Sequence, residues 1–93
     1  MSGRVNGKMA FVTGAAQGLG EAISHMLAKE GAKVVLADIN AEKLKGTEEK
    51  INHEFPGKVF STKLDVTSEQ EWREALAFAE EKMGGINILV NNA

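Results

Sequence analysis

Short apolar runs alternate along the chain with longer stretches in which apolar residues recur every three or four positions. Continuous apolar runs are typical of strands buried on both faces, whereas spacings of three and four are typical of helices with one buried side. We therefore predict four strands and three helices in strict alternation. This order predicts βαβ units and an α/β fold with a parallel sheet.

Turn and capping residues mark the ends of these elements. The predicted strands are Met9 to Thr13, Lys33 to Ile39, a part of Lys58 to Val66, and Ile86 to Val90. The first helix is predicted from Gly18 to Glu30, with Gly31 as its left-handed cap and an apolar side of Leu19, Ala22, Ile23, Met26 and Leu27. The second begins after a cap at Asn40 and ends at Pro56-Gly57, and the third begins with a capping box from Ser68 to Glu71 and ends at Gly84-Gly85.

The composition is that of an ordinary globular protein. The chain has 93 residues, of which 43% are hydrophobic and 26% are charged, and its net charge is -2. This length predicts one domain, and this charge gives no basic footprint for a nucleic acid. No apolar run approaches the roughly 18 to 20 residues of a membrane span, and Met1 to Lys8 lack the apolar segment of a secretory signal. There is no cysteine, which excludes disulfides but leaves the redox compartment undetermined. We expect a cytoplasmic protein because neither a membrane span nor a secretory signal is found in the sequence.

A glycine-rich segment, TGAAQGLG at Thr13 to Gly20, joins the first predicted strand to the first predicted helix. The first N–H groups of a helix have no intrahelical partners and lie at the positive end of its dipole. A strand, a glycine turn and a helix start therefore form a site for a phosphate or pyrophosphate. Gly14 would allow the sharp turn, Gly18 the close approach of a ligand, and Gly20 the tight packing of helix against sheet.

Two other interpretations of this loop are a Walker P-loop and a turn that binds no ligand. A Walker P-loop needs a lysine followed by serine or threonine, and Glu21 and Ala22 stand there instead. The spacing G-x-x-x-G-x-G also differs from the common dinucleotide pattern G-x-G-x-x-G. A loop that serves only the chain turn stays open, although the position between a strand and a helix argues against it.

Asp38 ends the second predicted strand, 24 residues after Gly14. An acidic residue about 20 residues beyond the loop binds the adenosine ribose in dinucleotide-binding folds. Its charge also repels a 2′-phosphate, by ~1 kcal/mol at about 4 Å in water and ~4 kcal/mol at an effective dielectric of 20. Because Gln17 precedes the second glycine and Ile39 follows Asp38, we expect no basic residue beside the site, and we predict NAD rather than NADP. The alternative is that Asp38 only caps the next helix.

Three motifs together resemble the short-chain dehydrogenase/reductase family. They are TGAAQGLG after the first strand, LDV at Leu64 to Val66 after the third, and NNA at Asn91 to Ala93 after the fourth. The resemblance covers the whole chain but less than half of a usual member. It implies an incomplete Rossmann-type doubly wound parallel sheet with strand order 3-2-1-4. The fourth strand would then be an edge, and part of one face of the sheet would be uncovered.

The resemblance also implies which residues hold the cofactor. Gly14, Gly18 and Gly20 would hold it together with the Leu19 backbone, and Asp38 and Ile39 would flank the adenosine ribose and adenine. Asp65 would accept a hydrogen bond from the adenine amino group, Val66 would pack on the ring edge, and Asn91 to Ala93 would line the cofactor. Gln17, next to Gly18, completes the candidate set. Simpler interpretations stay open, since Asp65 and Asn91-Asn92 are also ordinary turn residues.

Catalytic and metal-binding residues are not assigned. The family transfers a hydride between NAD(P) and an alcohol or ketone, using a serine, a tyrosine and a lysine, but this sequence contains no tyrosine. We therefore expect residues 1–93 to be the N-terminal part of a single NAD(P)-binding domain, inactive alone and homo-oligomeric when full length. The alternative is a non-catalytic nucleotide-binding module completed by a partner chain. His25 and His53 are 28 residues apart without nearby ligand partners, so we expect no metal site.

Overall fold

A computed structural model of the chain describes residues 7–92. Its strands and helices alternate from end to end, as the sequence predicts, and all strands run parallel. The elements are β1 (Met9–Thr13), α1 (Gly18–Lys29), β2 (Lys33–Asp38), α2 (Ala41–Glu54), β3 (Val59–Lys63), α3 (Glu69–Met83) and β4 (Ile88–Val90).

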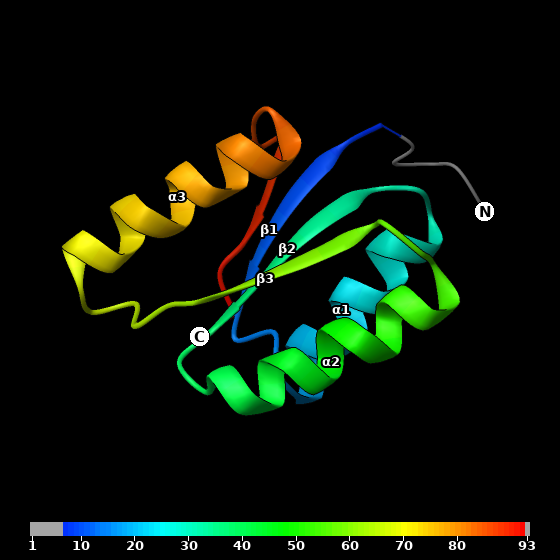
Figure 1. The fold of residues 1–93 in the computed structure, drawn as a ribbon, viewed down its shortest axis with the longest axis horizontal. Helices are drawn as coiled ribbons and strands as arrows, with labels where there is room; N and C mark the ends of the chain where they lie inside the picture. Colours follow the sequence, from blue (N-terminus) through cyan, green and yellow to red (C-terminus); the bar gives the residue numbers. More distant parts are fainter. Residues whose placement is uncertain (1–6, 93) are drawn as a thin grey trace.

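The sheet has the predicted strand order, β3-β2-β1-β4. Phe11 in the middle of β1 lies opposite Val35 of β2 and Leu89 of β4. Figure 1 shows α1 and α2 on one face of this sheet and α3 on the other. The α/β class, the doubly wound arrangement and the strand order are therefore confirmed.

Two apolar clusters, one on each face, hold the layers together. Ala10 and Val12 of β1 pack with α1 and α2, whereas Phe11 between them packs with α3. The same alternation occurs in β2, because successive side chains of a strand point to opposite faces. Both central strands are therefore buried on both sides, which explains their continuous apolar sequences.

The predicted caps of α2 and α3 are present. The Asn40 side chain accepts a 3.1 Å hydrogen bond from the Lys43 N–H, and the Ser68 hydroxyl accepts a 3.2 Å bond from the Glu71 N–H. The capping box is only half formed, however. Glu71 does not return to the Ser68 N–H; its carboxylate accepts a 2.8 Å bond from the Asp65 N–H, and the Ser68 N–H donates to the Asp65 carbonyl instead.

The buried side of α1 differs from the prediction. Its buried residues are Gly20, Ser24, Leu27 and Ala28. Leu19 and Met26, predicted to face the core, are 66% and 53% exposed. The helix approaches the sheet closely, and small residues permit that approach better than large apolar ones, which the hydrophobic pattern does not reveal.

β4 forms an edge of the sheet within the described residues, and it is shorter than the predicted Ile86 to Val90. Ile88 and Val90 pack on the cluster beneath α1 and α2. Leu89 points to the opposite face and is 59% exposed, so α3 leaves this side of β4 uncovered. Among residues 7–92, no helix is both long and apolar enough to cross a membrane.

Candidate nucleotide site at the carboxyl ends of the strands

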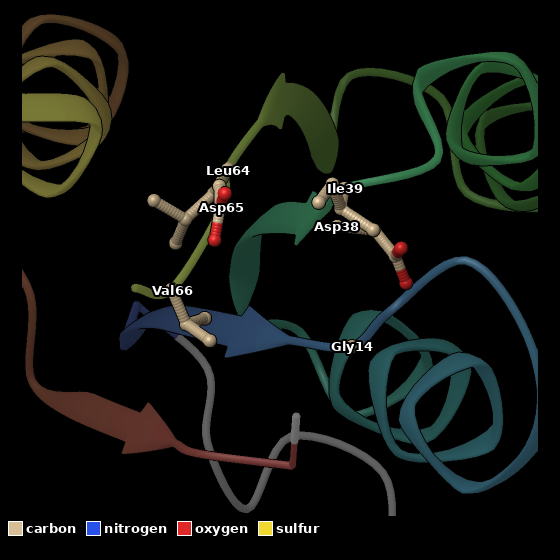
Figure 2. A pocket seen from close by; sticks show the side chains of 6 residues that line it. All are labelled: Gly14, Asp38, Ile39, Leu64, Asp65 and Val66. Atoms are coloured by element: carbon tan, nitrogen blue, oxygen red, sulfur yellow. The ribbon is translucent and has the colours of Figure 1, made fainter. Parts of the chain in front are cut away.

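A cavity of about 280 Å³ opens where β1, β2 and β3 end. In a parallel sheet these ends share one edge, and ligands of doubly wound folds bind there. Figure 2 shows Asp38 and Ile39 on one side of the cavity and the segment from Leu64 to Val66 on the other. The sixth lining residue is Gly14, at the end of β1.

Asp38 is fixed by two backbone groups. Its Oδ2 accepts a 3.0 Å hydrogen bond from the Ala16 N–H in the glycine loop, and its Oδ1 accepts a 3.0 Å bond from the Asn40 N–H. Asn40 in turn caps α2, so Asp38 joins the loop, β2 and the start of α2. The capping alternative and the cofactor prediction are thus compatible, because each carboxylate oxygen has more than one lone pair.

The glycine loop makes a turn that a side chain would obstruct. Gly14 has φ +63°, a left-handed conformation that favours glycine. At Gly20 the reason is space, since a Cβ atom there would lie 2.0 Å from the Gly14 carbonyl oxygen and 2.9 Å from Asn92 Nδ2. The backbone of α1 therefore touches the turn after β1, which is the tight packing predicted for this glycine.

The start of α1 is open, unlike the starts of α2 and α3. Within the part of the chain that the structure describes, no side chain caps α1, and Gln17 stands at its cap position in an extended conformation. Gln17, Gly18 and Leu19 are exposed. The N–H groups of this first turn can donate hydrogen bonds to an anion. The loop that leads into the turn starts at Gly14, which lines the cavity.

Asp65 lies in a turn, as its alternative interpretation predicts, and it also lines the cavity. Its Oδ1 accepts a 2.6 Å hydrogen bond from the Thr67 hydroxyl and a 2.9 Å bond from the Thr67 N–H. These bonds, the hydroxyl bond first, hold the pKa of the Asp65 carboxyl below its ordinary value, with a smaller contribution from the charge of Lys63. Both bonds described on this carboxylate end on Oδ1, so Oδ2 can accept a ligand donor.

Asn91 and Asn92 are tied to β1 and its turn. The Thr13 hydroxyl donates to Asn91 Oδ1 at 3.1 Å and accepts a 2.8 Å bond from the Asn92 N–H. The Asn92 amide group donates to the Gly14 carbonyl at 3.4 Å. These hydrogen bonds therefore stabilise the turn at Gly14, although neither Asn91 nor Asn92 lines the cavity. Ala93, the last predicted site residue, lies outside the described residues.

The structure brings together five of the predicted residues around the cavity: Gly14, Asp38, Ile39, Asp65 and Val66. Sequence reasoning missed Leu64, which is both a core residue and part of the cavity wall. It also missed Thr13 of β1, whose hydroxyl forms hydrogen bonds with Asn91 and Asn92, 78 and 79 residues further along the chain.

The expectation that no basic residue adjoins the site is wrong. Lys43, in the first turn of α2, donates a hydrogen bond from Nζ to Gln17 Oε1 in the glycine loop. The helix start brings it there, because Asn40 caps α2 next to Asp38. A positive charge therefore lies at the rim of the loop, and only the folded chain reveals it.

These residues fit one half of a dinucleotide. About 280 Å³ is close to the lower limit of the ~300 to 1,000 Å³ of small-molecule sites, so the cavity suits a base and sugar rather than a whole dinucleotide. Its walls combine three apolar side chains, Ile39, Leu64 and Val66, with two carboxylates. The open start of α1 suits the adjoining phosphates. Within residues 7–92, no three His, Cys, Asp or Glu side chains are arranged to hold a metal ion.

Known proteins are similar to this chain in sequence. A family described as short chain dehydrogenase matches residues 8–93. A 2,5-dichloro-2,5-cyclohexadiene-1,4-diol dehydrogenase of Sphingobium indicum is 43% identical over 93 residues, which are 100% of this chain and 37% of that protein. The 7alpha-hydroxysteroid dehydrogenase of Escherichia coli is 42% identical over 90 residues, which are 97% of this chain and 35% of that protein.

Solved structures give the same result. A crystal structure of hydroxysteroid dehydrogenase from Escherichia coli superposes with a TM-score of 0.91 at 42% identity, covering 97% of this chain and 38% of that one. A short chain dehydrogenase from Mycobacterium smegmatis superposes with a TM-score of 0.93 at 34% identity, covering 98% of this chain and 38% of that one. The chain thus spans little more than a third of the length of these relatives. The match over nearly all of its residues, together with the motifs at the strand ends, shows that the chain belongs to the short-chain dehydrogenase family.

Proposed function

We propose that residues 1–93 form the N-terminal part of a single NAD-binding domain and supply the adenosine and pyrophosphate half of its site. One observation carries this proposal: Gly14, Asp38 and Asp65, from three different strand ends, surround one cavity beside an open helix start. In the proposed complex Asp38 binds the ribose hydroxyls, and Asp65 Oδ2 accepts a hydrogen bond from the adenine amino group. Ile39 and Val66 cover the ring, and the loop from Gln17 to Gly20 binds the pyrophosphate.

The proposed reaction of the whole protein is hydride transfer between NAD and a small alcohol or the corresponding ketone. NAD, when bound, supplies the ring carbon that takes or gives the hydride. The names of the two relatives above both describe alcohol dehydrogenation, which supports this substrate class. Since the sequence has no tyrosine, we propose that the acid/base of the family is not among these residues and that the chain alone is inactive. A cytoplasmic, homo-oligomeric full-length enzyme completes the proposal.

Binding of nucleotides to the chain tests this proposal by isothermal calorimetry. We expect AMP and NAD to bind and nicotinamide mononucleotide, which has no adenosine, not to bind. We also expect NAD to bind more tightly than NADP, by about fivefold to several-hundredfold, the range that the repulsion of Asp38 gives at 1.4 kcal/mol per decade. Equal binding of the two mononucleotides, or no binding of NAD, would contradict the proposal.

A further inference from the structure

Two consecutive residues of α3 bind the backbone of the segment that lines the cavity. Glu71 Oε1 accepts a 2.8 Å hydrogen bond from the Asp65 N–H. The Trp72 indole donates a 2.9 Å hydrogen bond from Nε1 to the Val66 carbonyl oxygen. Neither side chain is among the residues that line the cavity, so both affect it through the backbone of Asp65 and Val66.

Each of these side chains is held in place by a strand of the sheet. Lys63 of β3 lies with Nζ 3.5 Å from Glu71 Oε1, and the Glu71 side chain is only 31% exposed. The Trp72 ring stacks on Phe11 of β1, with centroids 5.9 Å apart and planes inclined by 28°. Phe11 is fully buried, so Trp72 connects the cavity wall to the centre of the core.

The backbone between β3 and α3 is therefore fixed at three points. The Asp65 N–H binds Glu71, the Asp65 carbonyl accepts a 2.9 Å bond from the Ser68 N–H, and the Val66 carbonyl binds Trp72. The direction of a side chain follows from the conformation of its own backbone. Holding these groups therefore aims the Asp65 carboxylate and the Val66 side chain into the cavity, as Figure 2 shows. Such preorganisation lowers the ordering cost of binding.

We propose that Glu71 and Trp72 are positioning residues for the recognition of adenine: they touch no ligand, but they fix Asp65 and Val66 in the orientation that distinguishes adenine from other purines. This inference rests on the proposed function, in which the cavity holds the adenosine half of NAD. It adds the residues that give the site its base specificity.

The test compares AMP with inosine 5′-monophosphate, which carries a carbonyl oxygen in place of the adenine amino group. The unsubstituted chain should prefer AMP, because the Asp65 carboxylate needs a donor. Glu71→Ala should weaken AMP binding by about tenfold, since the competent orientation of the segment becomes a minor state, and it should weaken inosine monophosphate binding much less. The ratio of the two affinities should thus fall toward one, whereas general destabilisation would weaken both ligands alike.

Matched variants separate positioning from loss of structure. Glu69→Ala removes a carboxylate from the same turn of α3 and should leave the ratio unchanged. Glu69 is 83% exposed, and among residues 7–92 its ion pair is with the surface residue Arg73, at 3.4 Å. Glu71→Gln keeps an acceptor for the Asp65 N–H and should restore most of the preference. Trp72→Phe keeps the ring on Phe11 but removes the donor to Val66, and it should lower the ratio even if Glu71→Ala fails to fold by circular dichroism.

The outcomes distinguish this inference from the proposed function. If the unsubstituted chain bound neither AMP nor NAD, the proposed function would fall and this inference with it. If it preferred AMP but both Glu71→Ala and Trp72→Phe kept the full preference, the inference alone would be overturned.

Discussion

The carboxylate of Asp38 accepts a 3.0 Å hydrogen bond from the backbone N–H of Ala16, and this bond ties the end of β2 to the glycine loop after β1. Two features that are 22 residues apart in sequence thus form one unit. Because the Ala16 N–H holds the Asp38 carboxylate, the negative charge has a fixed position relative to the loop. A ligand that binds to the loop will therefore meet this charge at a fixed place.

Asp38→Asn tests the role of that charge in the choice of cofactor. The amide keeps one acceptor but removes the repulsion of a 2′-phosphate, so the ratio of the NADP and NAD dissociation constants should fall by about fivefold or more. Calorimetric titration with both cofactors measures this ratio, in which any general loss of structure cancels. Glu42→Gln removes a carboxylate from the first turn of α2 and should leave the ratio unchanged. An unaltered ratio in Asp38→Asn would show that its charge does not select NAD.

The positive charge of Lys43 should oppose the preference for NAD over NADP that Asp38 gives. Its ammonium group binds Gln17 at the rim of the loop, and an exposed positive charge there favours a more negative ligand. Exposed ion pairs contribute about 0.2 to 1 kcal/mol, so Lys43→Met should raise the preference for NAD by no more than about fivefold. Lys45→Met is the matched control, because Lys45 lies on the same helix and pairs with Glu48. Equal effects of the two substitutions on the cofactor ratio would refute a local role for Lys43.

Gly20→Ala and Gly46→Ala should change stability in opposite directions. A Cβ atom at residue 20 would lie 2.0 Å from the Gly14 carbonyl oxygen, a clash with backbone that costs about 3 kcal/mol or more unless α1 moves away. At residue 46 nothing lies within 4 Å of the new atom, and alanine is favoured over glycine in a helix by about 0.5 to 1 kcal/mol. Unfolding in urea measures both changes. A stable Gly20→Ala chain that still binds AMP would contradict the close contact of α1 with the turn.

Thr13→Val should destabilise the chain although the two side chains have nearly the same shape. The buried Thr13 hydroxyl accepts from the Asn92 N–H and donates to Asn91, and valine leaves both groups without this partner. The loss should be about 1 to 3 kcal/mol in the free energy of unfolding. Thr62→Val on β3 is the control, since no hydrogen bond of the Thr62 side chain is found among the described residues. A loss no greater than in this control would rule out the role given to Thr13.

The sequence predicts this fold well because the relevant signals are local. The order of the elements, the caps at Asn40 and Ser68, and the left-handed Gly84 after α3 all depend on residues a few positions apart. The cavity residues could be found for a related reason, since each follows directly after a predicted strand and parallel strands end at one edge.

The wrong and missing predictions all concern contacts between segments that are distant in sequence. Lys43 reaches Gln17 across 26 residues, and Thr13 reaches Asn91 across 78. The face that α1 buries depends on how closely it approaches the sheet, so Leu19 and Met26 are exposed despite their apolar side chains. Periodicity identifies a helix, but it does not say which of its small residues another element will touch.

The lowered pKa of Asp65 predicts how the turn responds to acid. The Thr67 hydroxyl is the largest cause of this shift, followed by the Thr67 N–H. A carboxyl whose pKa is lower in the folded chain contributes stability that is present above its unfolded pKa and is lost as the pH falls through the folded pKa. Thr67→Val removes the hydroxyl bond, so the pKa of Asp65 should rise toward its ordinary value. The loss of stability over this acidic range should then become smaller.

Titration of the Asp65 carboxyl carbon by nuclear magnetic resonance measures the pKa directly. Thr67→Ser keeps a hydroxyl on the same backbone and should keep the pKa low, which separates the hydrogen bond from the loss of a methyl group. Because the ionised form is the acceptor proposed for the adenine amino group, AMP binding should weaken at a higher pH in Thr67→Val than in Thr67→Ser. The same acid midpoint for binding in both variants would show that ionised Asp65 is not the group that receives the base.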